Sequence, residues 1–357
     1  DGERRVIRRL LSGDPIVLAT GGGAFMDPET RAAMRAEAIS IWLRCRLPTL
    51  LRRVATRSNR PLLLDSDPAE VLERLMAQRH PVYAEADMVV DCGDENPDTT
   101  TAQVLAALCA WTPPRRLAVA LGRGGAERGY EVVIGEGLLA CAGALLAPVL
   151  PQKRAVVVTD ATVARLHLPA LLAGLAETAI AVQPIVVGVG ETEKSIEAYA
   201  RLVDGLLEAG VERRTAVIAL GGGVVGDLAG FAAATTLRGL PFVQVPTTLL
   251  AQVDSSVGGK TGVNTKRGKN LVGAFHQPRM VLADTATLAS LPPRELRAGY
   301  AEIAKAGLIA DAALFAWCEA NGPALVHGAR AIQAEAVLRA CAFKAGVVGD
   351  DEREEKV

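Results

Sequence analysis

The sequence has few of the features that mark membrane proteins or nucleic-acid-binding proteins. Its 357 residues carry a formal net charge of -1, and no stretch is dominated by lysine and arginine. No apolar run reaches the roughly 18 to 20 residues that a membrane-spanning helix needs. These absences argue against nucleic acid and against membranes as partners. With 50% hydrophobic residues, the chain can instead bury the cores of two or three domains.

Cysteine is also scarce, and no two cysteines form a CxxC pair. The six residues are scattered along the chain, at Cys45, Cys92, Cys109, Cys141, Cys318 and Cys341. This spacing favours reduced, mostly buried thiols over a disulfide framework, and we see no signal peptide. We therefore expect a cytoplasmic protein. The chain opens at DGERRVIRRLL without methionine and stops at DDEREEKV within a charged helical pattern, so we expect both ends to be internal to a longer protein.

Short apolar runs alternate with amphipathic helical patterns along most of the chain. This alternation predicts parallel sheets that helices cover on both faces. The expected strands are 16–20, 39–43, 88–91, 117–121, 155–159, 180–187, 215–220, 242–245 and 280–283.

Two changes in this pattern divide the chain. Paired prolines in WTPPRR, residues 111–116, stop a helix before a new strand begins, which predicts a domain boundary. From Pro292 onward the strand signals end, and consecutive helical segments follow. We therefore expect domains at 1–111, 117–291 and 292–357, with a linker at 112–116.

A triglycine turn, within ALGGGVVGD at 219–227, joins an apolar strand to a helix of small residues. Residues without Cβ let a ligand approach the N–H groups at the helix start, where the helix dipole favours a negative group such as phosphate. Gly221, Gly223 and Gly226 match the dinucleotide fingerprint, but the acidic residue expected about 20 positions later is missing. A tight turn with no ligand is the alternative.

Residues 238–278 interleave basic, amide and hydroxyl side chains with glycines around a short apolar strand. The segment VDSSVGGKT resembles a nucleotide P-loop, but Asp254 stands where that pattern needs glycine, so we reject a P-loop here. The cations and amide that remain are able to clamp a phosphorylated sugar or acid. They are Arg238, Lys260, Lys269 and Asn270. The alternative is a solvated basic loop.

Four motifs, in order and at matching spacing, resemble 3-dehydroquinate synthase. They are LGGGVVGDLAGFAAATTLRG, VPTTLLAQVDSSVGGKTGVN, GKNLVGAFHQP and LRAGYAEIAKAGLI, and the resemblance runs from about Arg115 to the end of the chain. It implies a lyase that uses NAD and a divalent metal, zinc or cobalt. Such an enzyme converts 3-deoxy-arabino-heptulosonate 7-phosphate to 3-dehydroquinate and phosphate. It also implies an N-terminal α/β domain followed by a helical one.

The same resemblance assigns roles to individual residues. It implies NAD contacts at Asp160, Glu191, Lys194, Gly222, Gly223, Asp227, Thr247, Thr248 and Lys269. It implies substrate contacts and catalysis at Arg238, Asp254, Lys260, Asn270 and Lys305, and a metal ligand at Glu302. Glu302 and Lys305 are three residues apart, so they share one face of a helix. Without the resemblance, a surface ion pair is an equally good interpretation of these two.

The chain departs from this family in its metal ligands. The resemblance places two further ligands, both histidines, after the last helix, and the four histidines present (His80, His167, His276 and His327) do not replace them. One carboxylate cannot hold zinc tightly, so we expect impaired catalysis from this chain. Thr162 and Ser290 are smaller departures, at positions where the family usually has asparagine and threonine.

Residues 1–111 resemble the C-terminal two thirds of shikimate kinase. The resemblance rests on VLATGGGAFMDPETR, ISIWLRC, RRVATRSNRPLLL and RLMAQRHPVYAEADMVVD. It implies shikimate contacts at Gly21, Gly22, Gly23 and Arg79, a lid arginine at Arg60, and Arg53 beside the adenine of ATP, which binds with magnesium. For the arginines, an exposed helix face is the alternative. The P-loop of the family would precede Asp1, so we do not expect this part to act alone.

Together the two resemblances predict a bifunctional enzyme of aromatic amino-acid biosynthesis. The fold expected is a kinase-type remnant with a parallel sheet, then a Rossmann-like α/β domain that binds NAD, then an all-α domain for metal and substrate. The partners expected are small-molecule substrates, and the synthase part allows a homodimer. Two other functions stay open. One is an NAD- and metal-dependent polyol dehydrogenase of the same fold, against which the phosphate clamp argues. The other is a non-catalytic binding protein, against which the retained Glu302 and Lys305 argue.

Overall fold

The computed structural model describes residues 2–13, 16–55, 67–110, 113–121, 129–353 and 355. The contacts divide the chain into two compact units, the first built mainly from residues 1–111 and the second from most of residues 112–357.

The first unit consists of helices around a short parallel sheet. Its strands, β1 (Ile41–Cys45) and β2 (Met88–Cys92), pair in register from Ile41 opposite Met88 to Cys45 opposite Cys92. The helices are α1 (Gly2–Leu11), α2 (Pro28–Glu37), α3 (Leu47–Ala55), α4 (Pro68–Tyr83) and α5 (Pro97–Ala110), with a 3-10 turn η1 (Ala24–Met26) before α2. β2 matches the predicted strand 88–91 to within one residue, and β1 lies two residues later than the predicted strand 39–43.

The strand predicted over residues 16–20 is not present, so this prediction was wrong. The segment has no regular secondary structure, and all five of its side chains are exposed. A strand forms only when its N–H and C=O groups pair with a neighbouring strand. No strand in the described part of this unit pairs with the segment. Its apolar composition predicted a strand without showing whether a partner was available.

The second unit is built on a seven-stranded sheet in the order β3-β4-β11-β8-β7-β5-β6. The strands are β3 (Arg115–Val119), β4 (Tyr130–Gly135), β5 (Arg154–Asp160), β6 (Ala181–Val187), β7 (Ala216–Gly221), β8 (Phe242–Pro246) and β11 (Met280–Asp284). The pair β3–β4 is antiparallel, and the other neighbours are parallel. The parallel strands therefore end at one edge of the sheet.

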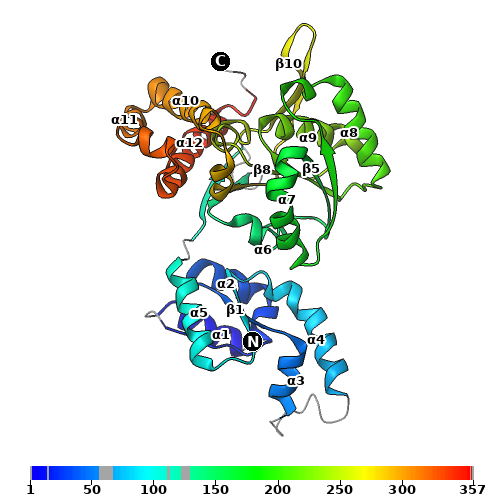
Figure 1. Cartoon of the computed structure of the whole chain (residues 1–357), viewed down its shortest axis with the longest axis vertical. Helices are drawn as coiled ribbons and strands as arrows, with labels where there is room; N and C mark the ends of the chain where they lie inside the picture. The colour runs from blue at the N-terminus through cyan, green and yellow to red at the C-terminus, as the bar shows by residue number, and fades with distance from the viewer. Residues whose placement is uncertain are drawn as a thin grey trace. The chain divides into compact units, whose positions relative to one another are not determined.

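Helices cover both faces of this sheet (Figure 1). The register aligns one row across five strands: Val158, Ala219, Gln244, Val281 and Val132. On this side, α8 (Ile196–Glu208) and α9 (Gly223–Thr235) pack over β5 and β7. The opposite side carries α7 (Ala161–Ala176), which contacts η4 (Leu138–Cys141), and the short α6 (Ala142–Leu146) follows η4. This double cover explains why the central strands are apolar throughout.

A helical part follows the sheet, as the sequence predicts from Pro292 onward. It contains α10 (Pro293–Ala310), α11 (Ala312–Val326) and α12 (Arg330–Asp350), which gather at one side of the unit in Figure 1. Their buried side chains form one core with residues of β3, β4 and β11. None of the helices that the structure describes is both long and apolar enough to cross a membrane.

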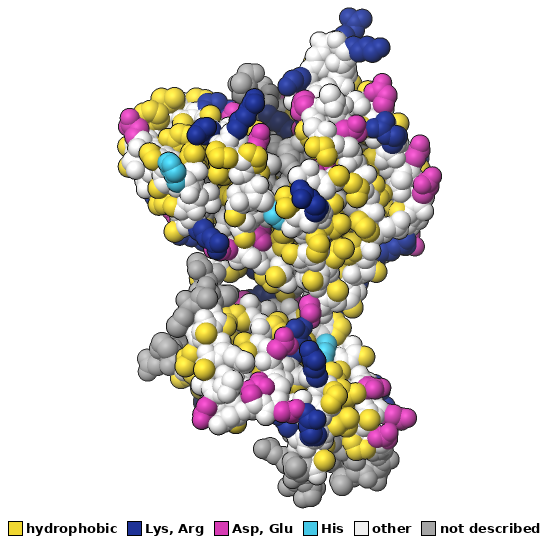
Figure 2. Space-filling view, in the orientation of Figure 1, with side chains coloured by type: hydrophobic (Ala, Val, Ile, Leu, Met, Phe, Trp, Pro, Cys, Tyr) yellow, Lys and Arg dark blue, Asp and Glu magenta, His cyan; other side chains and the backbone are white. Residues whose placement is uncertain are grey.

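Three strands of this unit were missed in the sequence. One is β4, and the other two form an antiparallel hairpin, β9 (Lys260–Thr265) with β10 (Gly268–Phe275). The hairpin projects from the unit in Figure 1, and basic side chains gather at its tip (Figure 2), where Lys266 and Arg267 are exposed. Residues 260–275 of the basic segment are therefore mostly strand rather than loop. Val263 on β9 is buried in the same core as α8 and α9, which holds the hairpin in place.

Candidate active site

The strand ends of the second unit bring most of the predicted site residues to one edge of the sheet. Asp160 ends β5, the glycine turn follows β7, and Thr247 and Thr248 follow β8. Open α/β sheets bind their ligands at the carboxyl ends of the strands. The edge is therefore the place where a ligand site is expected in this fold.

A side chain in the glycine turn would make tight contacts with its neighbours. Gly222 caps the N-terminus of α9, and a Cβ there would lie 3.0 Å from Thr248 Cγ2. A Cβ at Gly223 would lie 3.2 Å from Ser255 Oγ. The backbone N–H of Thr247 donates to the carbonyl oxygen of Gly221 at 3.0 Å, which ties the loop after β8 to the end of β7. The N–H groups at the start of α9 are thus presented by a turn that is fixed on both sides.

Lys194 and Asp227 form an ion pair beside this turn. Lys194 follows the 3-10 turn η5 (Glu191–Glu193) and is only 7% exposed, while Asp227 lies on the second turn of α9. Burial raises the pKa of the Asp227 carboxyl, Lys194 lowers it, and the charges of Glu191 and Asp254 raise it. The net effect is a pKa above the ordinary value. Four predicted site residues therefore lie within electrostatic range of one another.

Glu191 is the centre of a second set of contacts. Its Oε1 accepts a hydrogen bond from Asn264 Nδ2 at 2.8 Å and lies 3.5 Å from Lys269 Nζ. Burial raises the pKa of Glu191, but Asn264, Lys269 and Lys194 outweigh burial and hold it below its usual range. Asn270 joins this set through its backbone N–H, which donates to Asn264 Oδ1 at 3.1 Å. Glu191 is therefore held as a carboxylate.

Asp254 lies on a π-helical turn, η7 (Ala251–Ser255), between the sheet edge and the helical part. Its Oδ1 accepts a hydrogen bond from Lys344 Nζ of α12 at 2.7 Å. The turn is anchored by Gln252, a fully buried residue whose Nε2 donates to the carbonyl oxygens of Pro246 at 3.1 Å and Asp284 at 2.9 Å. Single π turns inside helices are frequent at functional sites. Asp254 is thus presented by an unusual but well-anchored turn.

Glu302 and Lys305 form an ion pair on α10. The hydrogen bond to Glu302 raises the pKa of Lys305, and the charges of Glu302 and Asp254 act in the same direction. Among the described residues, no three His, Cys, Asp or Glu side chains come together as a metal site. His276 and His327 bond to backbone carbonyl oxygens, at 2.9 Å and 2.6 Å. Among the residues that the structure describes, Glu302 is therefore the only predicted ligand for a metal, which does not fit a tightly bound ion.

The remaining predicted residues of the second unit have mainly local contacts. The Asp160 carboxylate accepts from the N–H groups of Thr162 at 2.8 Å and Val163 at 3.0 Å, at the start of α7. Thr248 Oγ1 accepts from the N–H of Ala251 at 3.1 Å. Arg238 has a left-handed backbone, with φ of 67°. Lys260 begins β9, opposite Phe275 of β10.

Two residues of these clusters were missed in the sequence. Lys344 lies in the helical pattern RACAFKAGVVGD, and Asn264 lies in the motif GKTGVN. Both reach their partners across long separations in the chain, 90 residues from Lys344 to Asp254 and 73 from Asn264 to Glu191. A polar residue placed between apolar helix positions was the only signal for Lys344, and it is equally typical of an exposed face.

The first unit brings two of its predicted residues, Gly22 and Arg79, together with Tyr83. The Tyr83 hydroxyl donates to the carbonyl oxygen of Gly22. A Cβ at Gly22 would lie 2.7 Å from Tyr83 Oη and 2.9 Å from an Arg79 guanidinium nitrogen, so the ends of both side chains approach this turn. Arg53 lies elsewhere, on α3, and donates to the carbonyl oxygen of Gly93 at 2.6 Å and to Cys45 Sγ at 3.3 Å. Arg60 lies outside the described residues.

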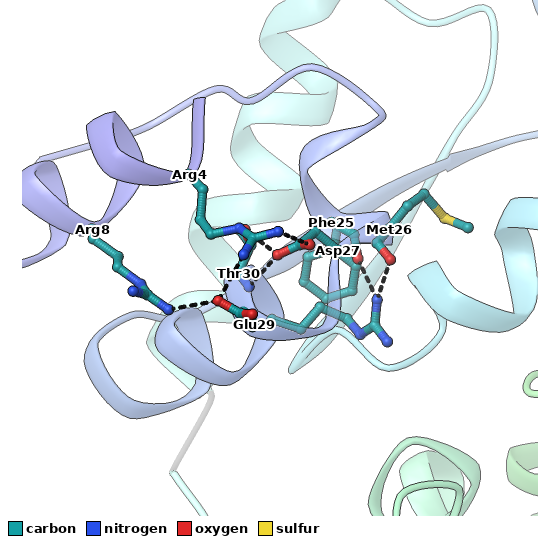
Figure 3. Close-up of polar contacts among 8 residues, drawn as sticks. Arg4, Arg8, Phe25, Met26, Asp27, Glu29 and Thr30 are labelled. Atoms are coloured by element: carbon teal, nitrogen blue, oxygen red, sulfur yellow. Dashed lines mark hydrogen bonds and ion pairs between the residues drawn. The ribbon is translucent and has the colours of Figure 1, made fainter. Parts of the chain in front are cut away.

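An ion-pair network fixes the segment that follows this turn (Figure 3). Asp27 caps α2 by accepting from the N–H of Thr30 at 2.8 Å, and it pairs with Arg4 of α1 at 2.8 Å. Arg4 also pairs with Glu29 at 2.7 Å. The bonds from Thr30, followed by Arg4, hold the pKa of Asp27 below its usual range. The residues after the triglycine turn are therefore tied to α1 and α2.

The fold and these clusters define an α/β protein with a candidate ligand site at the carboxyl edge of its sheet, followed by a helical domain. Comparison with known families is specific about each segment. Residues 184–298 match 3-dehydroquinate synthase N-terminal, residues 299–357 match 3-dehydroquinate synthase C-terminal, and residues 1–109 match shikimate kinase. The chain thus joins a segment of the shikimate kinase family to one of the 3-dehydroquinate synthase family.

Curated relatives agree for the second segment. The chain is 59% identical over 238 residues to 3-dehydroquinate synthase of Rhodospirillum rubrum, which covers 67% of this chain and 61% of the relative. It is 55% identical over 237 residues to that of Ruegeria pomeroyi, which covers 66% and 63%. The chain therefore spans less than two thirds of the length of these relatives.

Solved structures support the fold. A 2-epi-5-epi-valiolone synthase from Streptomyces hygroscopicus, with NAD+ and Zn2+ bound, is 35% identical, with a TM-score of 0.59 and coverage of 64% of this chain and 63% of that one. A 2-deoxy-scyllo-inosose synthase complexed with carbaglucose-6-phosphate, NAD+ and Co2+ is 29% identical, with a TM-score of 0.60 and coverage of 68% and 66%. An iron-containing alcohol dehydrogenase, 21% identical with a TM-score of 0.53, shares the fold.

Proposed function

We propose that residues 113–357 act as a 3-dehydroquinate synthase module. The module would bind NAD and 3-deoxy-arabino-heptulosonate 7-phosphate, which the enzyme converts to 3-dehydroquinate and phosphate with zinc or cobalt. The metal and cofactor follow the two solved relatives described above. None of the described cysteines is in a disulfide, which supports a cytoplasmic location, and a homodimer through this module stays a prediction.

One observation carries the proposal: four predicted site residues, of which Asn270 is assigned to the substrate and the others to the cofactor, form one set of polar contacts, and Asp254 acts on that set electrostatically. Lys194 pairs with Asp227 beside the glycine turn. Glu191 reaches Asn270 through Asn264. Asp254 acts electrostatically on Asp227 and on Lys305. If these contacts served only to stabilise the fold, they would not need to join residues that the family resemblance assigns to NAD with residues that it assigns to the substrate.

The residues suggest how the module would work. When bound, NAD supplies a reversible hydride acceptor for a secondary alcohol of the substrate. Gly222 and Gly223 leave the start of α9 open to a phosphate group, whose negative charge the helix dipole favours. Lys260, Lys269 and Arg238 supply positive charge for the leaving phosphate, which electrostatic attraction would orient. No step is assigned to a metal, because Glu302 is the one predicted ligand in this chain.

For residues 1–109 we propose a shikimate-binding part of a shikimate kinase, which would use ATP and magnesium in the whole enzyme. The contact of Arg79 and Tyr83 with Gly22 supports this proposal, since it puts a guanidinium beside a turn whose backbone is open. Guanidinium groups recognise carboxylates well, and shikimate is a carboxylate.

Calorimetry tests the synthase proposal directly. The chain is expected to bind NAD+, and Gly222→Val is expected to abolish binding, because its side chain would occupy the turn against Thr248. Gly346→Ala on α12 is the matched control, because nothing lies within 4 Å of its Cβ. A chain that binds neither NAD+ nor the heptulosonate phosphate would contradict the proposal.

A turnover assay separates the synthase from a polyol dehydrogenase of the same fold. A synthase returns the hydride within one turnover, so any turnover releases phosphate without net NADH. A dehydrogenase accumulates NADH when it is given a polyol. Net NADH formation from an unphosphorylated polyol would therefore favour the dehydrogenase.

A further inference from the structure

Asn264 lies between two groups of predicted site residues, and it has no predicted role of its own. It lies on β9, next to the end of the strand, and its side chain is half-buried. On one side the backbone N–H of Asn264 donates to the carbonyl oxygen of Lys194 at 2.8 Å, and Asn264 forms an isolated β-bridge with Ser195. On the other side β9 pairs with β10, which carries Lys269 and Asn270. The backbone of Asn264 thus joins two segments that are far apart in the chain.

The side chain of Asn264 uses both of its polar ends. Nδ2 donates to Glu191 Oε1 at 2.8 Å, and Oδ1 accepts from the backbone N–H of Asn270 at 3.1 Å. An amide carries its donor and its acceptor on two separate atoms, so Asn264 can make both contacts at once. Aspartate would keep the acceptor, but it would lose the donor and place a second carboxylate against Glu191.

The same contact holds the backbone of Asn270 in an uncommon conformation. Its φ of 58° lies in the left-handed region, which asparagine tolerates better than most other non-glycine residues. The hydrogen bond to Asn264 Oδ1 fixes the backbone at this residue, so it also fixes where the Asn270 side chain begins. Loss of the bond would let the turn at the start of β10 relax.

We propose that Asn264 is a positioning residue that couples cofactor binding to substrate binding. Glu191 and Lys194 lie on the cofactor side of its amide, and Asn270 lies on the substrate side. A ligand that orders Glu191 also orders the amide, and the amide then holds Asn270 ready for the second ligand. The inference rests on the proposed function, because it takes the roles of these residues from it.

The coupling between the two ligands can be measured directly. The affinity of the whole chain for NAD+ is determined by calorimetry without and with saturating heptulosonate phosphate, and again with inorganic phosphate as a simpler probe. Positive coupling between two sites is typically about fivefold or more, and it is reciprocal. We expect such coupling in the wild type. Asn264→Ala is expected to reduce it to less than about twofold, because both contacts are lost.

Two further variants distinguish a coupling role of Asn264 from a purely structural one. Asn264→Asp retains the bond to Asn270 but repels Glu191, so it is expected to weaken NAD+ binding more than phosphate-ester binding. Asn321→Ala is the matched control, because Asn321 makes one local bond to Trp317 on α11, at 2.9 Å. A purely structural role would lower both affinities equally and leave the coupling factor unchanged.

The possible results separate the two proposals. If both ligands bind and Asn264→Ala or Asn264→Asp keeps wild-type coupling, the inference about Asn264 is overturned while the proposed function stands. Wild-type binding without any coupling also overturns it. If the wild type binds neither ligand, the proposed function fails, and the role of Asn264 fails with it. Loss of coupling in both variants, with Asn321→Ala unchanged, supports the inference.

Discussion

Lys344 Nζ lies 2.7 Å from Asp254 Oδ1, so the last helix of the chain is joined to the π-helical turn at the sheet edge. A second contact follows the same route, since Cys341 Sγ donates to the carbonyl oxygen of Gln252 at 3.2 Å. The Lys344 and Asp254 side chains keep 24% and 35% of their exposure, so both stay accessible to a ligand. The pair therefore connects the helical domain to the candidate site without being sealed in the core.

Replacement of Lys344 tests whether this pair serves the substrate. In Lys344→Met, Asp254 loses its cation and presents an unpaired negative charge to an anionic substrate. Affinity for the heptulosonate phosphate is expected to fall about threefold to tenfold, as for one charge-assisted hydrogen bond at a partly exposed site. NAD+ affinity is expected to change little. Calorimetry measures both, with Lys266→Met at the exposed hairpin tip as the control.

Close packing of α9 gives a second prediction, on stability. A Cβ at Gly230 would lie 2.4 Å from Thr261 Cγ2 and 3.0 Å from the Phe242 ring. Gly230→Ala is therefore expected to lower the free energy of unfolding of the second unit by about 1 to 3 kcal/mol, through overpacking. Gly346→Ala, in the open on α12, is expected to raise it by up to about 1 kcal/mol, through helix propensity. Urea unfolding followed by circular dichroism compares the two, and equal stability of both variants would disprove the packing argument.

The sequence predicts the buried parallel strands best, and it predicts structures held by distant contacts worst. Strands β5, β7, β8 and β11 are apolar because helices cover both faces, so their runs stand out. Strand β4 was missed because a short apolar run has no periodicity that separates strand from helix. The hairpin β9–β10 was missed because its lysine, asparagine and glycine residues have low strand propensity, and pairing with each other holds them.

In the candidate site, too, the sequence predicts individual residues better than it predicts the contacts between them. The family motifs gave Lys194, Asp227, Asp254 and Glu302 as separate residues with separate roles. They could not give the Lys194–Asp227 pair, because it depends on where η5 approaches α9 in space. They also gave no reason to choose Lys344 among the many polar residues of a helical pattern. Residue types follow from local sequence, whereas partners follow from the topology that brings distant segments together.

Asp27 is expected to make the stability of the first unit depend on pH. Its pKa in the folded state lies below the ordinary 3.8, so the folded state binds fewer protons than the unfolded state near that pH. The stabilisation by Asp27 is therefore complete above pH 3.8 and is lost as the pH falls through the lower, folded-state value. Asp27→Asn keeps a capping oxygen but removes the charge that pairs with Arg4.

Hydrogen exchange in α2 measures this effect. The free energy of local opening is expected to be lower in Asp27→Asn than in the wild type at neutral pH. The difference is expected to shrink as the pH falls below 3.8. Asp98→Asn on α5 serves as the control, because that residue has no ion pair among those described. A difference that grows on acidification would show that the sign of the argument is wrong.

The last prediction concerns the triglycine turn of the first unit. The Tyr83 hydroxyl donates to the Gly22 carbonyl, and the Tyr83 ring lies 5.9 Å from the Trp42 ring of β1 and 6.3 Å from that of Phe25. Tyr83→Phe keeps these ring contacts and removes one hydrogen bond, whose net worth is about 0.5 to 1.5 kcal/mol. The turn is then free to move away from Arg79, so shikimate affinity is expected to fall about threefold to tenfold in calorimetry. Tyr199→Phe, which removes a hydroxyl contact with Thr235 on the second unit, is expected to leave that affinity unchanged. Equal shikimate binding by Tyr83→Phe and the wild type would mean that the turn is held by its packing rather than by the hydroxyl.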